Sequence, residues 1–160
     1  MPWGVMVRAT LLTPVHRREG DQLVHAVVVG CGRVGSAVAS RLAGEGWTVS
    51  VIDQSMESFN RLDPAFPGDR VEGHALDEDV LCHAGITRAD ACVVCTDGDN
   101  TNLVTAQLVQ RKFGVTTTVV RVLDPARAEL YARLGLRTVC PTTTAIDTLS
   151  EAALAARAEA

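Results

Sequence analysis

The chain has 160 residues, of which 47% are hydrophobic and 21% charged, and it carries a formal net charge of −4. This length suits a single globular domain and excludes a multidomain machine. Nucleic-acid binding requires clustered basic residues, which the sequence lacks, so we expect no nucleic-acid partner. Charged residues or glycines interrupt every apolar run before the roughly 18 to 20 residues of a membrane span, so we expect no direct membrane insertion.

Residues 1–23 form an N-terminal extension. Their apolar patch is broken and ends at Pro14, and they contain no A-x-A cleavage site, so they do not match an export signal. We expect this extension to be loosely ordered, because terminal segments are poorly ordered unless something holds them. The alternative is a strand or arm that packs on a partner subunit.

A glycine-rich loop follows the first predicted strand, residues 25–30. Gly30, Gly32 and Gly35 form a G-x-G-x-x-G motif between this strand and a predicted helix over 35–44, which is the context of a dinucleotide-binding fingerprint. Gly30 would permit a tight turn, Gly32 would let the backbone approach a pyrophosphate, and Gly35 would let the helix pack close to the strand. Free N–H groups at the helix start would bind phosphate oxygens. The alternative is a glycine turn that serves packing alone.

Asp53 ends the second predicted strand, residues 47–53, which begins at a turn around Gly46. It lies 23 residues beyond Gly30, where a carboxylate accepts hydrogen bonds from the ribose hydroxyls of an adenosine and repels a 2′-phosphate. The three residues that follow, 54–56, include no arginine that could bind such a phosphate. The sequence therefore favours NAD(H) or ATP/ADP, with an unphosphorylated ribose, over NADP.

The rest of the chain continues to alternate strands and helices. Predicted strands cover 70–75, 90–96, 116–123 and 137–141, and predicted helices cover 56–62, 77–85, 100–114, 124–135 and a last segment from 143 onward. Strands that are mostly continuous apolar runs, separated by helices, imply a parallel sheet covered on both faces. The predicted fold class over residues 24–142 is therefore α/β: a Rossmann-like, doubly wound parallel sheet of about six strands with helices on both faces.

The cysteines indicate reduced thiols. There are five, an odd number in a chain without an export signal: Cys31, Cys82, Cys92, Cys95 and Cys140. Cys92 and Cys95 have the spacing of a redox or zinc pair, but residues i and i+3 of a strand point to opposite faces of a sheet. We therefore expect small buried core residues there. No histidine is spaced to complete a metal site with them, so we expect no metal.

Four stretches, 27–42, 49–55, 73–109 and 119–141, together resemble the nucleotide-binding N-terminal domain of Trk- and Ktr-type potassium-uptake regulators, also called the RCK or KTN domain. The resemblance implies that Arg33 and Arg121 contact phosphates, with a neighbouring subunit as the other possibility for Arg121. It places residues 73–77 at the adenosine, although His74 and Leu76 stand where the family usually has Asp and Thr. The candidate binding residues are Gly30, Cys31, Gly32, Arg33, Val34, Gly35, Asp53, Gln54, His74, Ala75, Leu76, Asp77, Thr96, Asp97, Gly98, Asn102 and Arg121.

Some of these side chains have simpler interpretations. Asp77 and Asp99 can cap the helices that follow them, a role compatible with ligand contact. Arg33 and Arg121 can be solvated charges or ion-pair partners. Two further expectations concern aromatic and apolar residues: Phe113 and Tyr131 belong to the core on helix faces, and Met56 and Phe59 form the adenine-side wall.

The resemblance implies a regulatory subunit, not an enzyme. It would bind NAD(H) or ATP/ADP in the cytoplasm, lie at the inner face of the membrane through a partner, and gate a potassium transporter or channel subunit by conformational change. The Y-x-x-x-K pair of short-chain dehydrogenases is missing, because Gly135 stands four positions after the only tyrosine, Tyr131. The sole lysine, Lys112, is not in a phosphate-binding P-loop. The alternative is a small NAD-dependent oxidoreductase or a cofactor-binding fragment of one.

Residues 143–160 form a predicted helix with an apolar stripe that includes Ile146 and Leu149. One interpretation is a helix packed back on the sheet. The resemblance implies instead a helix that crosses to a second subunit and leads to a C-terminal domain that this sequence lacks. We therefore expect a homodimer or a larger ring.

Overall fold

The computed structural model describes residues 24–158, so the predicted extension lies outside the described residues. The strands are β1 (His25–Val29), β2 (Thr48–Asp53), β3 (Asp69–Glu72), β4 (Ala91–Val94), β5 (Thr117–Arg121) and β6 (Arg137–Val139). The α-helices are α1 (Arg33–Gly44), α2 (Glu78–His83), α3 (Asp99–Phe113), α4 (Pro125–Arg133) and α5 (Pro141–Ala158). Two 3₁₀ helices, η1 (Met56–Arg61) and η2 (Ile86–Arg88), complete the order.

The strands form one six-stranded parallel sheet in the order β3-β2-β1-β4-β5-β6. Successive connections run outward from β1 in one half of the sheet and outward from β4 in the other. The carboxyl ends of β1 and β4 therefore open a crevice, the place where doubly wound sheets bind their ligands. The predicted α/β Rossmann-like fold is confirmed.

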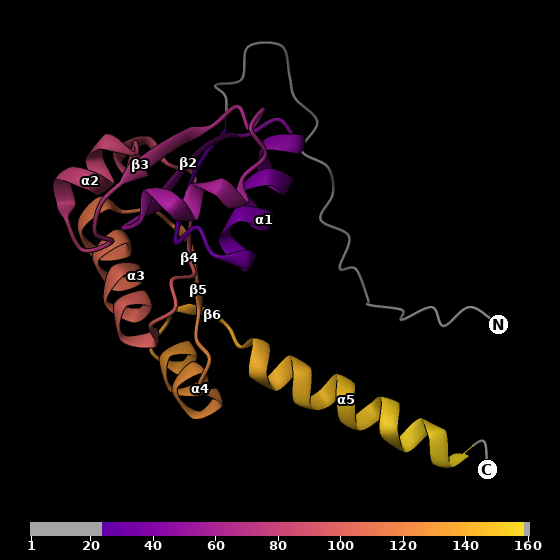
Figure 1. Ribbon diagram of the computed structural model, residues 1–160. Helices are drawn as coiled ribbons and strands as arrows, with labels where there is room; N and C mark the ends of the chain where they lie inside the picture. The colour runs from indigo at the N-terminus through magenta and orange to yellow at the C-terminus, as the bar shows by residue number, and fades with distance from the viewer. Residues whose placement is uncertain (1–23, 159–160) are drawn as a thin grey trace.

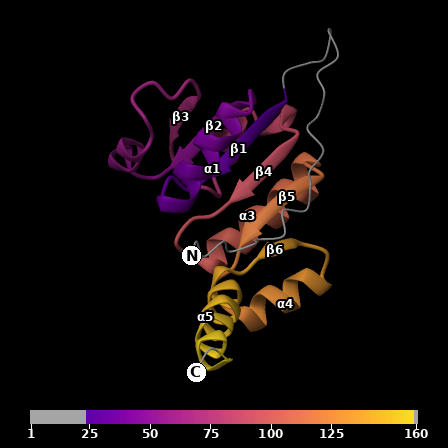
Figure 2. The ribbon, with the colours of Figure 1, turned by 90° about the vertical axis from the view of Figure 1, so that its right-hand side faces the viewer.

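Helices cover both faces of the sheet. Val27 and Val29 of β1 pack in one cluster with Leu81 of α2 and Leu103 of α3, whereas Val28 packs in a second cluster with residues of α1 and η1. Figure 1 shows α2 and α3 on one side of the sheet and α1 on the other, and Figure 2 shows the strands side by side. A strand buried on both faces needs apolar residues at every position, which explains the unbroken apolar run of β1.

Individual residues at the ends of the helices and strands explain several of the observed boundaries. Gly114, with a φ of 69°, ends α3 in the left-handed conformation, and Asp124 caps α4 by accepting the N–H of Arg127 at 3.0 Å. The third strand is shorter than predicted, ending at Glu72. It is an edge strand that pairs only with β2, and Glu72 lies opposite Asp53, the last residue of β2. Pairing therefore stops where the neighbouring strand stops.

The cysteine pair 92 and 95 behaves as expected for core residues. Cys92 belongs to the cluster under α2 and α3, and Cys95 belongs to the cluster under α1, so the two side chains lie on opposite faces of the sheet. All five cysteines, which lie within the described residues, are free thiols. Within the same residues, no group of three or more His, Cys, Asp or Glu side chains could hold a metal ion.

The C-terminal helix α5 extends away from the sheet (Figure 1). Its residues from Thr143 to Ala155 are exposed, including Ile146 at 54%, Leu149 at 70% and Leu154 at 68%. The interpretation of a helix packed back on the sheet is therefore wrong, because the domain leaves this apolar stripe uncovered. Among residues 24–158, no helix is both long and apolar enough to span a membrane.

Candidate functional site

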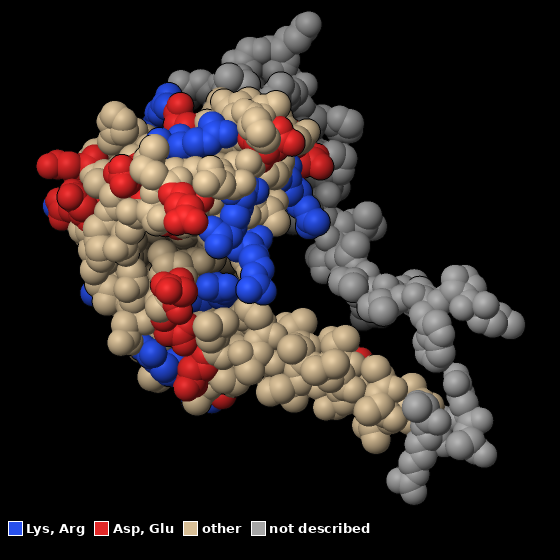
Figure 3. Space-filling model, in the orientation of Figure 1, with Lys and Arg blue, Asp and Glu red and all other residues tan. Residues whose placement is uncertain are grey.

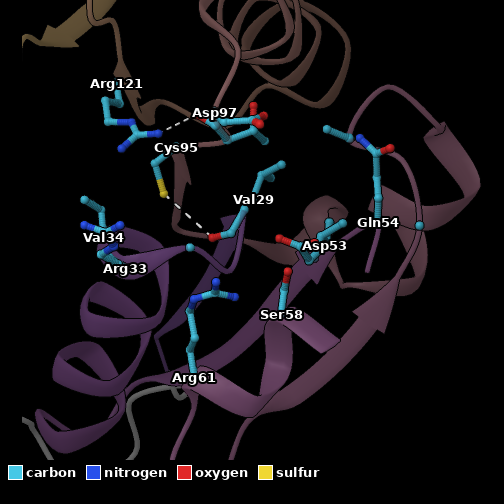
Figure 4. A pocket seen from close by; sticks show the side chains of 16 residues that line it. Val29, Arg33, Val34, Asp53, Gln54, Ser58, Arg61, Cys95, Asp97 and Arg121 are labelled. Carbon is cyan, nitrogen blue, oxygen red and sulfur yellow. Dashed lines mark hydrogen bonds between the residues drawn. The ribbon is translucent and has the colours of Figure 1, made fainter. Parts of the chain in front are cut away.

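A cavity of about 670 Å³ opens at the carboxyl ends of β1, β2 and β4. Its lining includes Val29, the last residue of β1, Ile52, the residue before the end of β2, and Cys95, which follows β4, and the start of α1 forms one wall. Figure 4 shows side chains from both halves of the sheet pointing into this space. This cavity thus coincides with the topological switch point of the sheet.

The glycine loop forms the wall beside α1. Gly30 has a φ of 100°, and a Cβ there would lie 2.8 Å from the backbone N of Thr96. A Cβ on Gly35 would lie 1.8 Å from the carbonyl O of Gly30, so α1 can sit this close to β1 only with glycine at that position. A Cβ on Gly32 would meet nothing within 4 Å. The backbone at Gly32 is therefore open to the cavity, as close approach of a phosphate requires.

The amino end of α1 presents donors to the cavity. Gly32 is the N-cap residue, and no side chain caps the helix. Gly32, Arg33 and Val34 all line the cavity. The first N–H groups of a helix have no partners within the helix and lie at the positive end of its dipole, so this wall suits an anion.

Asp53 lines the cavity beside the glycine loop. Its Oδ2 accepts the N–H of Cys31 at 2.7 Å, and its Oδ1 accepts the N–H of Ser55 at 3.0 Å. These two bonds fix the carboxylate against the glycine loop. Each carboxylate oxygen has a second lone pair, so the group can still accept two hydroxyl donors from a ligand.

A buried asparagine connects the residue that follows β4 by two positions, Thr96, to the last residue of β5, Arg121. Asn102 is fully buried, its Oδ1 accepts the N–H and the hydroxyl of Thr96 at 2.9 and 2.6 Å, and its Nδ2 donates to the carbonyl oxygens of Thr96 and Arg121 at 3.0 Å. Arg121 donates from Nη2 to the carbonyl O of Thr96 at 2.7 Å. Its Nε is buried without a hydrogen-bond partner among the described residues. An unpaired buried donor is costly, so an acceptor group such as a phosphate would satisfy it.

Basic side chains dominate the charge of this cavity. Arg33, Arg61 and Arg121 line it, against the carboxylates Asp53 and Asp97. In the space-filling view, basic side chains gather on this face of the domain, near the start of α5 (Figure 3). Electrostatic attraction therefore favours an anionic ligand.

The thiols near the cavity are not poised for reaction. Burial raises the pKa of the Cys95 thiol to about 11, although the positive charge of Arg121 opposes this effect. Burial, with the nearby Asp53 carboxylate, also raises the pKa of the Cys31 thiol. Because the thiolate is the nucleophile, these raised pKa values disfavour the reactive form of both groups at neutral pH.

The structure divides the predicted binding residues into two groups. Ten line the cavity: Gly30, Gly32, Arg33, Val34, Asp53, Gln54, Ala75, Thr96, Asp97 and Arg121. Seven lie outside its lining: Cys31, Gly35, His74, Leu76, Asp77, Gly98 and Asn102. Within the second group, Gly35 allows close contact between α1 and the Gly30 carbonyl, and Asn102 accepts the N–H of Thr96. The N–H of Cys31 donates to Asp53.

The two predicted helix caps have different outcomes. Asp77 is the N-cap of α2 and accepts the N–H of Asp79 at 2.9 Å, as expected. Capping by Asp99 is wrong, since Gly98 occupies the N-cap of α3. Asp99 instead accepts the N–H groups of Leu123 and Asp124 at 2.8 and 3.0 Å, which fastens the loop between β5 and α4 to the start of α3.

The aromatic expectations also differ in outcome. Phe113 and Tyr131 pack against the core, as predicted. Phe59 is a core residue with 6% exposure, Met56 is 61% exposed, and neither lines the cavity, so the predicted adenine-side wall is wrong. The side chains of η1 that do line it are Ser58 and Arg61.

Sequence reasoning missed five lining residues: Val29, Ile52, Ser58, Arg61 and Cys95. Gly73 also lines the cavity, and it belongs to the segment 73–77 that the resemblance placed at the adenosine. Val29, Ile52 and Cys95 follow from position alone, because they stand at the carboxyl ends of β1, β2 and β4. Ser58 and Arg61 lie three residues apart, the repeat of a 3₁₀ helix, and that spacing is the signal that could have found them.

The 3-2-1-4-5-6 parallel order and the arginine-lined cavity at its switch point define a Rossmann-type domain. A family model for the TrkA-N domain matches residues 26–142. The chain belongs to the TrkA-N domain family, and the resemblance to regulators of potassium uptake is confirmed.

Individual relatives support this assignment. The chain is 47% identical over 116 residues to the Trk system potassium uptake protein TrkA of Streptomyces coelicolor, a match that covers 72% of this chain and 52% of the relative. It is 30% identical over 108 residues to a TrkA homologue of Pyrococcus abyssi, covering 68% of this chain and 48% of the relative. The chain thus spans about half the length of these curated relatives.

A solved structure shares the fold over most of the chain. The Kef C-terminal domain of Shewanella denitrificans, solved in an AMP-bound form, superposes with a TM-score of 0.71 at 25% identity, over 82% of this chain and 80% of that one. That relative binds an adenine nucleotide.

Proposed function

We propose that this domain is the nucleotide sensor of a Trk-type potassium uptake system. It binds NAD(H) or ATP/ADP in the cytoplasm, and the bound nucleotide sets the conformation of an assembly that gates a membrane potassium transporter. The observation that carries the proposal is the lining of the cavity, which combines the uncapped start of α1, the Arg121 side chain with its unpaired Nε and the Asp53 carboxylate held by the glycine loop.

The proposed binding mode follows from these groups. The phosphates lie against Gly32 and the start of α1, where Arg33 and Arg121 neutralise their charge. The ribose hydroxyls donate to the free lone pairs of Asp53. The adenine extends past Gln54 toward Gly73 and Ala75, on the β3 side of the cavity. AMP, ADP, ATP and NAD(H) share the adenosine and the first phosphate, so one site serves them all.

Binding, not reaction, is the role that these side chains suit. The cavity offers arginines, carboxylates and backbone donors, and its thiols are held in the neutral form by burial. We therefore expect the nucleotide to leave unchanged. An oxidoreductase would need a group that transfers a proton at the substrate.

A second copy of the chain is the proposed partner of α5. Ile146 and Leu149 lie three residues apart, so they share one exposed face of this helix. A face of this kind is buried in an assembled protein. Crossing of α5 to a second domain would couple two nucleotide sites, and any gating signal requires that ligands bind the alternative arrangements with different affinity.

Isothermal titration with NAD, NADH, ATP, ADP and NADPH tests the proposal, with the protein first freed of copurified nucleotide. We expect unphosphorylated adenine nucleotides to bind at one site per chain while the absorbance of NADH stays constant. Consumption of NADH with a small-molecule substrate would support the oxidoreductase alternative. Absence of binding by all five would refute the sensor.

A further inference from the structure

The side chain of Asn102, near the start of α3, is fully buried and lies outside the lining of the cavity. Its amide uses every hydrogen-bonding position that it has. Oδ1 accepts the N–H and the hydroxyl of Thr96, and Nδ2 donates to the carbonyl oxygens of Thr96 and Arg121. A reversed amide would set Oδ1 against two carbonyl oxygens, so these partners fix its orientation. The amide is therefore fully engaged within the protein and has no donor or acceptor left for a ligand.

The two carbonyl oxygens that Asn102 holds are the two points from which Arg121 is placed. One belongs to Arg121 itself, the last residue of β5. The other belongs to Thr96 and also accepts Nη2 of Arg121 at 2.7 Å, the bond drawn from Arg121 in Figure 4. A single Nδ2 group thus fixes both the backbone that carries the guanidinium and the oxygen to which the guanidinium donates.

The start of α3 holds the same stretch of backbone at two further points. Asp99 accepts the N–H groups of Leu123 and Asp124 at 2.8 and 3.0 Å. Together with the bond from Asn102 to the Arg121 carbonyl, three hydrogen bonds join residues 121–124 to this one helix. The end of β5 is therefore held in register with the helix that also holds Thr96.

This arrangement leaves the charge of Arg121 available to a ligand. The group that accepts its Nη2 is a neutral carbonyl, and among the described residues no carboxylate forms an ion pair with it. Its Nε is buried without a hydrogen-bond partner in the same part of the chain. A guanidinium that is oriented in advance loses less freedom when it binds an anion. Asn102 thus controls the direction of a phosphate-binding group without touching the ligand.

We propose that Asn102 is a positioning residue of the phosphate site, which holds Arg121 in the direction from which its guanidinium meets the phosphates of an adenine nucleotide. This inference rests on the proposed function, since that function places the phosphates at Arg121. It gives Asn102 a role through Arg121 in place of the ligand contact expected from the sequence.

A double-mutant cycle on ADP binding, measured by calorimetric titration, tests this role. Asn102→Ala removes the four hydrogen bonds of the amide, and Arg121→Gln removes the guanidinium. We expect each single variant to weaken ADP binding by about tenfold or more, because both lose the same charged contact. The double variant should bind ADP within about twofold of Arg121→Gln alone, because Asn102 has no effect on the ligand once the guanidinium is gone.

Two further variants support the cycle. Asn102→Asp keeps the size of the side chain and the acceptor for Thr96 but loses the two donated bonds, so it should show the same coupling to Arg121→Gln if Asn102→Ala does not fold. Thr105→Val is the matched control. Thr105 is buried on the same helix, does not line the cavity, and has a hydroxyl without a partner among the described residues, so its replacement should leave ADP affinity unchanged.

The outcomes distinguish positioning from a general structural role. Weakening of ADP by the same factor with and without the guanidinium would mean that Asn102 acts independently of Arg121, and would overturn the inference. Unchanged ADP affinity in the Asn102 variants, or in Arg121→Gln, would overturn it as well and leave the proposed function standing. Failure of ADP to bind the wild-type chain would refute the proposed function, and the inference with it. The wild-type titration therefore separates the two failures.

Discussion

At the scale of single residues, Asp53 carries the proposed selectivity for ribose. Replacing it with alanine removes the acceptor of the two hydroxyls and also frees the N–H groups of Cys31 and Ser55. We expect Asp53→Ala to weaken ADP binding by about 1.5 to 3 kcal/mol, the usual range for hydrogen bonds to a charged group. Calorimetric titration measures the loss, with Asp63→Ala as a control, because Asp63 is exposed and outside the cavity. Unchanged affinity in Asp53→Ala would place the ribose elsewhere.

The buried thiols give a pH dependence at the same scale. Burial raises the pKa of Cys92 to about 12, above the ordinary value of 9.0 that applies in the unfolded chain. The folded protein then holds a proton that the unfolded chain releases, so the contribution of this group to stability is complete below pH 9 and falls as the pH rises from 9 toward 12. Denaturant unfolding at pH 8 and pH 10.5 should show a smaller loss in Cys92→Ala than in the wild type. Equal losses would contradict the assignment.

At the scale of elements, the contact between α1 and β1 sets the shape of the phosphate wall. A methyl group at position 35 would collide with the Gly30 carbonyl, so Gly35→Ala must push α1 away from the sheet. We expect a loss of about 1 to 3 kcal/mol in unfolding free energy, or more, together with loss of nucleotide binding. Gly44→Ala in the same helix is the matched control. Its added Cβ meets nothing within 4 Å, so it should stabilise the protein by up to about 1 kcal/mol.

The helix α5 gives the second prediction at this scale. Leu149→Asp places a charge in the exposed apolar stripe, so it should convert a dimer into monomers, as measured by sedimentation equilibrium. Thr148→Asp adds the same charge at an exposed neighbouring position, about 100° around the helix, and should leave the dimer intact. A wild-type chain that is monomeric at every concentration would contradict the role proposed for α5.

The elements also show which features the sequence could predict. The unbroken apolar run of β1 predicted a buried parallel strand, and Gly30, Gly32 and Gly35 predicted the turn, the open backbone and the close helix contact, because each depends on residues adjacent in sequence. The contacts of Asp99 with the loop after β5 could not be predicted, since they join segments far apart in the chain. Arg61 was missed for a related reason: its direction depends on η1 being a 3₁₀ helix.

At the scale of the whole molecule, two halves of one sheet meet at the proposed nucleotide site. The glycine loop and Asp53 belong to the β3-β2-β1 half, and Thr96 and Arg121 belong to the β4-β5-β6 half. A nucleotide between them would link the start of α1 in the first half to the end of β5 in the second half. The helix α5, which is proposed to contact a partner, follows β6 directly. A structural change in the β4-β5-β6 half of the sheet would therefore occur next to the start of this helix.

The central claim is that this single cavity binds adenine nucleotides through the parts they share. The most direct test is displacement: NADH bound to the nucleotide-free chain is followed by its fluorescence while ADP is added. We predict one NADH per chain and complete, competitive displacement by ADP, because both ligands place a ribose at Asp53 and phosphates at Gly32. Simultaneous binding of both, or no binding of either, would contradict the account.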